Sequence, residues 1–246
     1  MLSTVLSNDF LIFTLIVLLS YSIQALSGFG STVISVTLGL HFYTLDFLLP
    51  VLIPLDLVVN GYLTIRYRST ISRSILVNQI LPFMGIGLII GILIFQFSKA
   101  DVLKTACGIF VFLIAIQGLF YHVYRKISKI SSARFSMFTL FAGIFHGMFA
   151  SGGPLIVYAM SGIELSKATF RSTLSTIWAT MSCIMIVSFI VSGRMNITTL
   201  FYISVLFPII LLGILIGEKL HAETNEYYFG ITTYLLLIGA GLALII

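Results

Sequence analysis

The sequence predicts an all-α, polytopic membrane protein with about eight transmembrane segments in two repeats, each beginning with a helix that glycine breaks. Three observations predict this class. The chain of 246 residues is 59% hydrophobic and only 9% charged, whereas a soluble domain carries about 25% charged residues. Apolar runs of membrane-spanning length recur along the whole chain. Similar glycine-rich interruptions stand in two of those runs, one in each half.

Eight segments have the length and polarity of a helix that crosses a bilayer. They cover residues 10–40, 46–65, 75–97, 102–122, 135–162, 168–191, 198–217 and 228–246. We expect residues 1–122 to form a first transmembrane repeat, residues 123–134 a basic connecting loop, and residues 135–246 a second repeat. We therefore expect a multi-pass protein of a cell membrane, plasma or inner.

Two of these segments are too long for one straight crossing. Residues 10–40 would form a helix of roughly 46 Å, against a hydrocarbon core of about 30 Å. A break at residues 27–31 (SGFGS) divides this segment into a full helix and a half-helix. The segment 135–162 has the same excess and a break at residues 150–154 (ASGGP). Pro154 suits the first turn of the following half-helix, because its missing N–H costs nothing there.

Repeated small-residue patterns indicate an internal duplication. The pattern Pro-x4-Gly-x3-Gly occurs at residues 82–91 and again at 208–217, and residues 107–109 (CGI) align with 229–231 (FGI). Together with the two breaks, these are three matches in the same order along the chain. Glycines four residues apart also allow close helix packing, so the glycines of this pattern need no ligand to explain them.

Loop charges favour the loops after even-numbered segments, and hence both termini, as cytoplasmic. Eight Lys and Arg residues stand in those loops and five in the others. This orientation requires that the two broken segments each cross the membrane once. If the half-helix after each break re-enters instead, the parity changes, and an odd number of crossings per repeat makes the repeats inverted.

The breaks form the candidate binding site. An exposed N–H or C=O in hydrocarbon costs several kcal/mol, so broken backbone persists only inside protein or along a cavity. A half-helix beginning at Ser31 or Pro154 presents unpaired N–H groups and about half a positive charge, and two such ends that converge form an anion site. The alternative is that the glycines only pack helices at crossings. The substrate-binding residues expected from the breaks are Ser27, Gly28, Gly30, Ser31, Ser151, Gly152 and Gly153.

Three ionisable side chains fall within apolar segments, where a charge is usually functional. Arg171, early in its segment, has a guanidinium that matches a sulfonate or carboxylate, or else it snorkels to the interface. Asp56 is a candidate proton or cation site for coupling, or it is neutral or paired with Arg171 or a helix end. His146, four residues before the second break, either titrates with substrate binding or is a hydrogen-bonded core residue.

Other conspicuous side chains are interpreted without chemistry. Cys107 and Cys183 are small core residues, because neither has a CxxC partner or a metal-ligand spacing. Trp178 is a packing or membrane-belt residue. The sequence has no HExxH zinc motif, and a Ser151 nucleophile with His146 as base would lie on one broken helix in poor geometry. We expect no enzymatic activity, cofactor, metal or nucleic-acid partner. The expected partners are a small anionic substrate and the lipid bilayer, and the sequence indicates no oligomeric state.

The residues around the breaks carry a resemblance to a known family. The chain resembles the sulfite exporter TauE/SafE family of membrane proteins at residues 27–30 (SGFG), 147–158 (GMFASGGPLIVY), 170–173 (FRST) and 217–220 (GEKL). The resemblance covers nearly the whole chain. One departure is Ala150, which stands where the family commonly has glycine, so the backbone there is less free to adopt a positive φ.

The resemblance implies transport, usually export, of small sulfur-containing or organic anions such as sulfite, sulfoacetate or other organosulfonates. It also makes Arg171 the leading side-chain ligand. We expect a transporter that binds the anion between its two broken helices and moves one repeat against the other. Export from a cell that is negative inside gains about 2.3 kcal/mol per charge per 100 mV and needs no coupling ion. Uptake would need one, through Asp56 or His146. An anion channel and a non-transporting membrane accessory protein are the alternatives.

Overall fold

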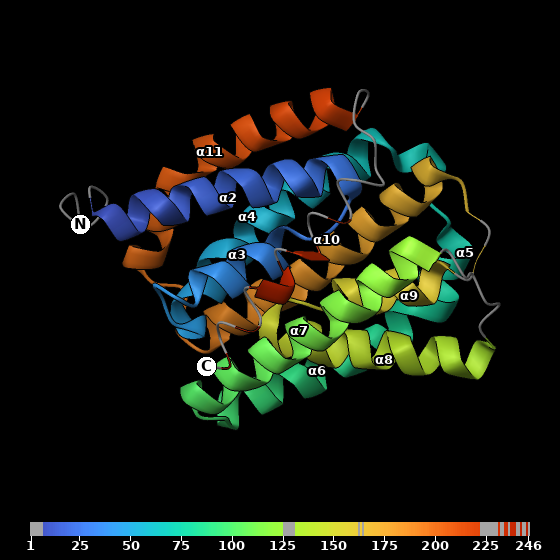
Figure 1. The fold of residues 1–246 in the computed structure, drawn as a ribbon, viewed down its shortest axis with the longest axis horizontal. Helices are drawn as coiled ribbons and strands as arrows, with labels where there is room; N and C mark the ends of the chain where they lie inside the picture. Colours follow the sequence, from blue (N-terminus) through green and yellow to red (C-terminus); the bar gives the residue numbers. More distant parts are fainter. Residues whose placement is uncertain are drawn as a thin grey trace.

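The computed structural model describes residues 7–124, 131–161, 163 and 165–221, together with eight separate positions between 231 and 245. This described part is built of helices and contains no strand. A 3-10 turn, η1 (Arg68–Thr70), and a π-helical turn, η2 (Leu76–Ile80), lead into α6. The helices are α2 (Asn8–Ser27), α3 (Ser31–Gly39), α4 (Leu45–Arg66), α5 (Arg73–Ile75), α6 (Leu81–Phe97), α7 (Ala100–Tyr124), α8 (Ser132–Phe149), α9 (Gly153–Ser161), α10 (Lys167–Val191) and α11 (Ile197–His221) (Figure 1).

Six helical stretches of the described chain are long and apolar enough to cross a membrane. They are Asn8–Ser27, Leu45–Arg66, Arg73–Phe97, Asp101–Phe120, Ala168–Val191 and Ile197–Leu220. Large apolar side chains such as Leu19 and Ile89 stand exposed on their outer faces, as lipid contact requires. The polytopic all-α class expected from the sequence is therefore confirmed. The eighth expected segment, residues 228–246, lies mostly outside the described residues.

Both expected interruptions are present. Between α2 and α3, Gly28 and Gly30 have φ of 85° and 106°, a left-handed conformation that glycine adopts without steric cost. Between α8 and α9, the interruption covers residues 150–152. After each interruption the chain reverses, and the following nine-residue helix packs back against the helix before it (Figure 1). Each half of the chain thus contains a re-entrant helical hairpin.

Three helices, α2, α4 and α11, run in the same direction. Near their first turns, the Tyr202 ring of α11 lies 5.3 Å from the ring of Phe10 in α2 and 4.9 Å from that of Phe47 in α4. Near the last turns, Arg66 of α4 pairs with Glu218 of α11 at 3.4 Å. Because α2 and α4 are parallel, α3 and the loop that follows it carry the chain back across the protein.

The corresponding helices of the second half run the other way. Asp56 of α4 contacts Ser182 of α10, and Ser72, after α4, contacts Thr173, so α10 is antiparallel to α4. Figure 1 shows α8 running opposite to α2. The direction of each half is therefore that of an inverted repeat, the outcome that re-entrant half-helices imply. The duplication itself stays a prediction.

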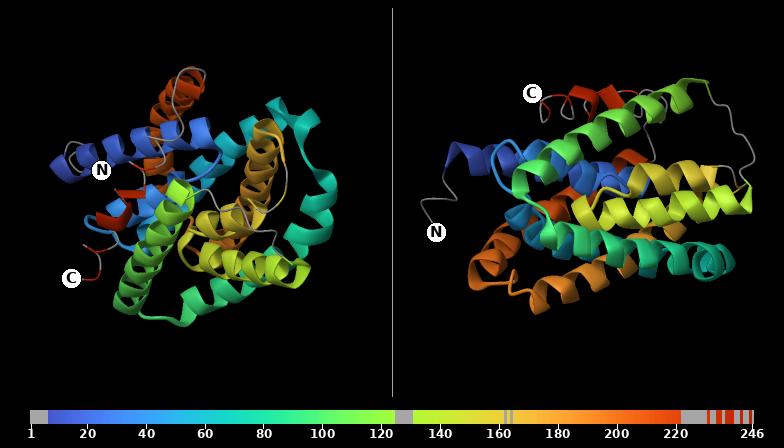
Figure 2. Two further views of the ribbon diagram at one scale, coloured as in Figure 1. Left: turned by 45° about the vertical axis from the view of Figure 1, so that its right-hand side comes forward. Right: turned by 90° about the horizontal axis from the view of Figure 1, so that it is seen from below.

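The repeated glycine pattern lies where helices touch backbone to backbone. Gly87 and Gly91 of α6 face Gly143 and Gly147 of α8, and a Cβ at any of the four would overlap the backbone of the opposite helix. Figure 2 shows α6 and α8 side by side along their length. In the other half, Gly217 of α11 lies in the same way against α2. Each half therefore packs one helix onto the first helix of the other half, through small residues that allow close approach.

The bundle has two ends, which we name after the arginine found at each. At the Arg194 end, Arg194 pairs with Asp46 at 3.4 Å and lies 4.5 Å from the ring of Phe95. At the Arg171 end, the guanidinium of Arg171 lies 5.2 Å over the Tyr67 ring. The Arg171 end therefore contains the last turns of α4 and α11 and the first turn of α10.

Positive charge concentrates at the Arg171 end. The condition behind the loop-charge orientation, one crossing per broken segment, is not met, because α3 and α9 turn back. By helix direction, the described Lys and Arg residues at the Arg194 end are Lys99, Lys104 and Arg194. Those at the Arg171 end are Arg66, Arg68, Arg73, Arg134, Lys167, Arg171 and Lys219. Three further residues, Arg125, Lys126 and Lys129, lie outside the described part.

Candidate functional site

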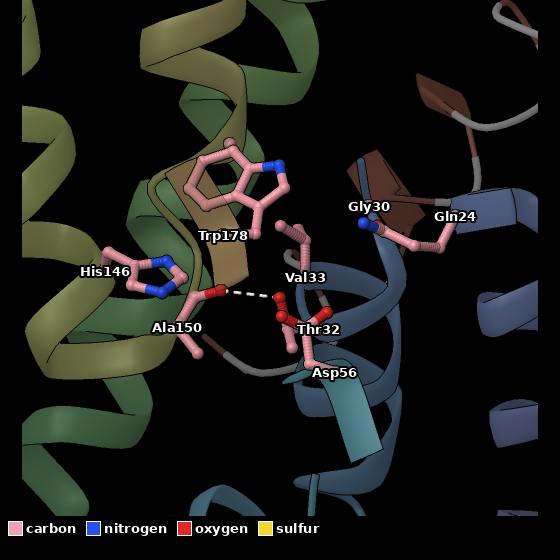
Figure 3. A pocket seen from close by; sticks show the side chains of 9 residues that line it. Gln24, Gly30, Thr32, Val33, Asp56, His146, Ala150 and Trp178 are labelled. Carbon is pink, nitrogen blue, oxygen red and sulfur yellow. Dashed lines mark hydrogen bonds between the residues drawn. The ribbon is translucent and has the colours of Figure 1, made fainter. Parts of the chain in front are cut away.

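The two helix breaks meet at one buried cavity between the halves of the chain. Thr32, in the first turn of α3, donates a hydrogen bond of 2.7 Å to the carbonyl oxygen of Ala150 (Figure 3). The free volume beside this contact is about 10 Å³, enough for about one water molecule. The first turns of α3 and α9 therefore face the same space. The lining residues are Gln24, Gly30, Thr32, Val33, Asp56, His146, Ala150, Gly153 and Trp178.

Gln24 fastens the first break from inside α2. Its amide nitrogen donates to Oδ1 of Asn60 at 2.8 Å and to the carbonyl oxygen of Gly28 at 3.2 Å. Its amide oxygen accepts from both the backbone N–H and the hydroxyl of Ser31, each at 3.2 Å. The Gln24 side chain thus forms hydrogen bonds with the backbone on both sides of the reversal, at Gly28 and at Ser31. These bonds hold the first break in a defined shape.

Asp56 lies beside this network, near the middle of α4. Its side chain is 3% exposed. Oδ1 accepts from the Ser31 hydroxyl at 3.0 Å, and Oδ2 accepts from the Ser182 hydroxyl of α10 at 3.1 Å. Asp56 therefore joins α3, α4 and α10 at the cavity wall through neutral donors alone, among the residues that the structure describes.

His146 and Trp178 form the opposite wall and keep polar atoms without partners. His146, in the last turn of α8, is 2% exposed, and its ring stacks on Trp178 at 5.1 Å between centroids (Figure 3). Among the residues that the structure describes, the two ring nitrogens of His146 have no hydrogen-bond partner, and neither has Nε1 of Trp178. The indole N–H can only donate, and an imidazole carries at least one N–H. An unpaired buried polar group costs about 1–3 kcal/mol, so two such donors beside a cavity mark a place for an acceptor.

The second break is shaped by residues 150–152. Ala150 adopts φ 53° and ψ 28°, and its N–H donates to the carbonyl oxygen of His146 at 2.7 Å. Ala150 thus adopts the positive φ that is unfavourable for alanine, at a cost of about 1–2 kcal/mol. The Ser151 hydroxyl turns to the carbonyl oxygen of Phe149 at 2.9 Å. A Cβ on Gly152 would lie 3.0 Å from Cβ of His146, so this residue packs against α8.

Arg171 does not line the cavity. Its Nη2 donates to the carbonyl oxygen of Ala25 in the last turn of α2, and its guanidinium lies over Tyr67. Arg171 is 8% exposed, and its Nε has no hydrogen-bond partner within the described part of the chain. A Cβ on Gly28 would lie 2.9 Å from Cγ of Arg171. Gly28 thus lies against Arg171, while its carbonyl oxygen accepts a hydrogen bond from Gln24, which lines the cavity. The first break therefore stands between Arg171 and the cavity.

Four of the ten site residues expected from the sequence line the cavity: Gly30, Asp56, His146 and Gly153. The hydroxyls of the three expected serines are hydrogen-bonded inside the protein, that of Ser27 to the carbonyl oxygens of Ile23 and Phe29 at 2.8 Å. Substrate binding by eight of the ten, and coupling by Asp56 or His146, stay predictions. The expected residues outside the cavity lining are Ser27, Gly28, Ser31, Ser151, Gly152 and Arg171.

Trp178 is the residue that sequence reasoning assigned to packing and that the structure places on the cavity wall. Two signals in the sequence pointed to it. Trp178 stands near the middle of its segment, whereas belt aromatics stand near the ends. It also follows Arg171 by seven residues, which is about two turns and therefore the same helix face.

Comparison with family models finds one that matches residues 13–244, the model of the sulfite exporter TauE/SafE family. The matched range contains both breaks and every residue that lines the cavity. Comparisons with curated proteins and with solved structures find no match. Because the family model covers nearly the whole chain, this protein belongs to the sulfite exporter TauE/SafE family of membrane transporters.

Proposed function

We propose that the protein is a carrier that exports a small sulfur-containing anion, such as sulfite, sulfoacetate or another organosulfonate, across the plasma or inner membrane. The anion binds in the cavity between the two broken helices. The observation that carries the proposal is the pair of buried donors, on His146 and Trp178, that have no acceptor within the described residues. A sulfur oxyanion supplies acceptor oxygens and neutralises the cost of leaving those donors unpaired.

The ends of the two half-helices add to this site. The first N–H groups of α3 and α9 have no partner within their own helices, and each end has about half a positive charge. Gly153, the first residue of α9, leaves room for about one methyl group, because a Cβ there would lie 3.9 Å from both Phe29 and Trp178, an ordinary van der Waals contact. An oxyanion can therefore approach the backbone at α9 while the indole of Trp178 donates to it.

The cavity between the breaks is smaller than the proposed anion. About one water molecule fits, which is less than a sulfite or sulfonate needs. The two walls must therefore move apart for the anion to bind. The contact between Thr32 and Ala150 bridges the walls, and its loss lets the halves separate, as alternating access between repeats requires.

The charge distribution gives a direction. By the positive-inside rule the Arg171 end faces the cytoplasm, and its basic residues attract anions from that side. Arg171 stands between that end and the first break and has an unpaired Nε donor. It therefore meets the anion before the cavity does. Outward movement of one negative charge that no co-transported cation compensates gains about 2.3 kcal/mol per 100 mV, so the membrane potential favours export of an anion that moves alone.

The test is thermal stabilisation of the purified protein by sulfite, sulfoacetate, thiosulfate, sulfate, acetate and chloride. One sulfur anion at about 100 times its dissociation constant should stabilise the protein by roughly 2.7 kcal/mol. Trp178→Phe should lose this effect, because the ring is kept and the donor is removed. Arg171→Ala should keep most of it.

Three other results are informative in this experiment. A shift lost in Arg171→Ala and kept in Trp178→Phe would place the anion at Arg171 and outside the cavity. Equal shifts with every anion of the same charge would contradict selectivity for sulfur oxyanions. The absence of any shift in the wild-type protein would overturn the anion-carrier proposal.

A further inference from the structure

We propose that Asp56 carries one proton that binds together with the anion, so that substrate and proton move as one unit. This inference rests on the proposed function and deepens it, since it names a co-transported ion and the residue that holds it.

Two oxygen–oxygen contacts of hydrogen-bond length involve the carboxylate of Asp56, and a third joins Ser31 to Gln24. Each of the three contacts needs one hydrogen. The Ser31 hydroxyl lies 3.0 Å from Oδ1 of Asp56 and 3.2 Å from the amide oxygen of Gln24. The Ser182 hydroxyl lies 3.1 Å from Oδ2. The two hydroxyls supply only two hydrogens. With an ionised Asp56, the single hydrogen of Ser31 is therefore shared between two acceptors.

The amide of Gln24 does not supply the missing hydrogen. Its oxygen faces Ser31, because the backbone N–H of Ser31 donates to it at 3.2 Å. Its nitrogen faces Oδ1 of Asn60, at 2.8 Å. The Asn60 amide nitrogen, in turn, donates to the backbone carbonyl of Asp56 at 3.0 Å. The orientation of both amides is thereby fixed, and the gap stays at Ser31.

A proton on Asp56 completes the set. The acid O–H on Oδ1 donates to the Ser31 hydroxyl oxygen, and Ser31 then donates to the amide oxygen of Gln24. Ser182 donates to Oδ2, which is the carbonyl oxygen of the neutral acid. Each of the three contacts now has its own hydrogen, so the geometry fits the protonated carboxyl group.

The surroundings of Asp56 give its charge no partner. Tyr21 donates to the carbonyl oxygen of Leu52 at 2.8 Å, and Arg171 donates to that of Ala25. No described Lys or Arg forms an ion pair with Asp56, and a buried charge without one is strongly disfavoured. The titratable and charged groups with described side chains on the elements around Asp56 are Asp9 and Tyr21 of α2, Arg134 and His146 of α8, Arg171 and Cys183 of α10, Tyr202, Glu218 and Lys219 of α11, and Asp46, Tyr62 and Arg66 of α4 itself.

Asp56 also lines the proposed anion site, and this couples the two ligands. An ionised carboxylate on the wall of so small a cavity repels an anion, whereas the neutral acid does not. Protonation of Asp56 therefore tightens anion binding, and by linkage the anion tightens proton binding equally. A monoanion moved with this proton carries no net charge, so its flux follows the concentration and pH gradients and does not respond to membrane potential.

The experiment measures proton uptake when sulfoacetate binds to the purified protein in weakly buffered detergent solution with a pH indicator. Both acid groups of sulfoacetate are ionised at neutral pH, so uptake reports on the protein. At a pH alkaline enough to ionise Asp56 in the anion-free protein, the wild type should take up about one proton per anion bound, and Asp56→Asn should bind the anion with none. Asp46→Asn is the matched control: it removes an acid of the same helix whose side chain is 59% exposed, and it should behave as the wild type.

Two outcomes overturn the inference while leaving the anion site intact. One is anion binding by the wild type without proton uptake at that alkaline pH, or with the same uptake in Asp56→Asn. The other is binding that requires sodium, which would place a cation among the same oxygen atoms.

A second measurement does not depend on the anion. Infrared spectra near neutral pH should contain the carbonyl stretch of a protonated carboxylic acid in the wild type and in Asp46→Asn, and this band should be missing in Asp56→Asn. Its absence from the wild type would overturn the inference whatever binds. The band without any anion binding would support the neutral Asp56 and contradict the proposed function, so the two failures are distinguishable.

Discussion

Both helix breaks reverse the direction of the chain, but they are held in different ways. The first has glycine at both left-handed positions, and Gln24 bonds to both strands of the reversal. The second has alanine in the left-handed conformation, and the polar atoms of the neighbouring His146 and Trp178 are unpaired. The first break is therefore saturated with internal hydrogen bonds, whereas the second keeps donors for an acceptor that the described residues do not supply. We therefore propose that the first break acts mainly as a fixed frame and that the second supplies the unpaired donors for the ligand.

The largest effect should separate two adjacent glycines of the second break. A Cβ on Gly152 would overlap the carbonyl oxygen of Ala142, which α8 cannot move. Gly152→Ala should lower the free energy of unfolding by about 3 kcal/mol through overpacking and reduce the yield of monodisperse protein. Gly153→Ala meets no atom closer than 3.9 Å and should melt like the wild type while binding the anion more weakly. Thermal melts and size-exclusion profiles check this pair, and equal losses in both variants would contradict the assigned roles.

The next effect concerns the unpaired donors. His146→Phe keeps a ring against Trp178 and removes two buried nitrogens without partners. It should raise the free energy of unfolding by about 1 kcal/mol without anion. It should also lose much of the roughly 2.7 kcal/mol that a saturating anion adds. Melting curves with and without sulfite measure both changes. A variant that is less stable than the wild type and still responds fully to sulfite would show that His146 is only a core residue.

Removal of the polar side chain that holds the first break should lower the stability, whereas His146→Phe should raise it. Gln24→Leu leaves the carbonyl of Gly28, the amide of Asn60 and the N–H of Ser31 without their partner. We expect a loss of about 2 kcal/mol, since each orphaned buried group costs about 1–3 kcal/mol and some are reached by water. Gln79→Leu, at an exposed position, is the matched control and should change little. A Gln24 variant as stable as the control would remove the contrast between the breaks.

The smallest effect is expected at Ala150. Ala150→Gly relieves about 1–2 kcal/mol of left-handed strain in the folded protein. Glycine also gives the unfolded chain more conformational entropy, which lowers the free energy of unfolding by about 0.4–1 kcal/mol. The net result should be a gain of about 0.5 kcal/mol, visible as a slightly higher melting temperature. The response to anion should not change. A lower melting temperature would mean that the buried methyl group contributes more through packing than the strain removes.

Much of the fold could be predicted from the sequence, because composition and helix length alone require spanning helices and two interruptions. The direction of the chain after each interruption could not. A glycine-rich run marks where a helix ends, but the reversal depends on the φ angles of Gly28, Gly30 and Ala150 and on the packing of the next helix. The orientation predicted from loop charges assumed that each broken segment crosses the membrane once. The reversal after each interruption removes that assumption.

The site was predictable where a residue is chemically unusual for its segment. Asp56 and His146 stand out in apolar runs, and both line the cavity. Trp178 and Gln24 stand out less, because neither side chain is ionisable. Arg171 stood out as a charge, yet its guanidinium binds the end of α2. Sequence gives the residue type, and only tertiary packing decides which way the side chain turns.

The central claim is that a sulfur anion is carried through the cavity between the breaks. The most direct measurement is exchange of labelled sulfite in proteoliposomes that contain the wild type or Trp178→Phe. We expect saturable flux that unlabelled sulfite on the opposite side accelerates, and we expect the variant to lose it although it is folded and inserted. Flux that rises linearly with concentration and ignores unlabelled sulfite would indicate a channel. Flux equal to that of empty liposomes, or unchanged in Trp178→Phe, would contradict the account.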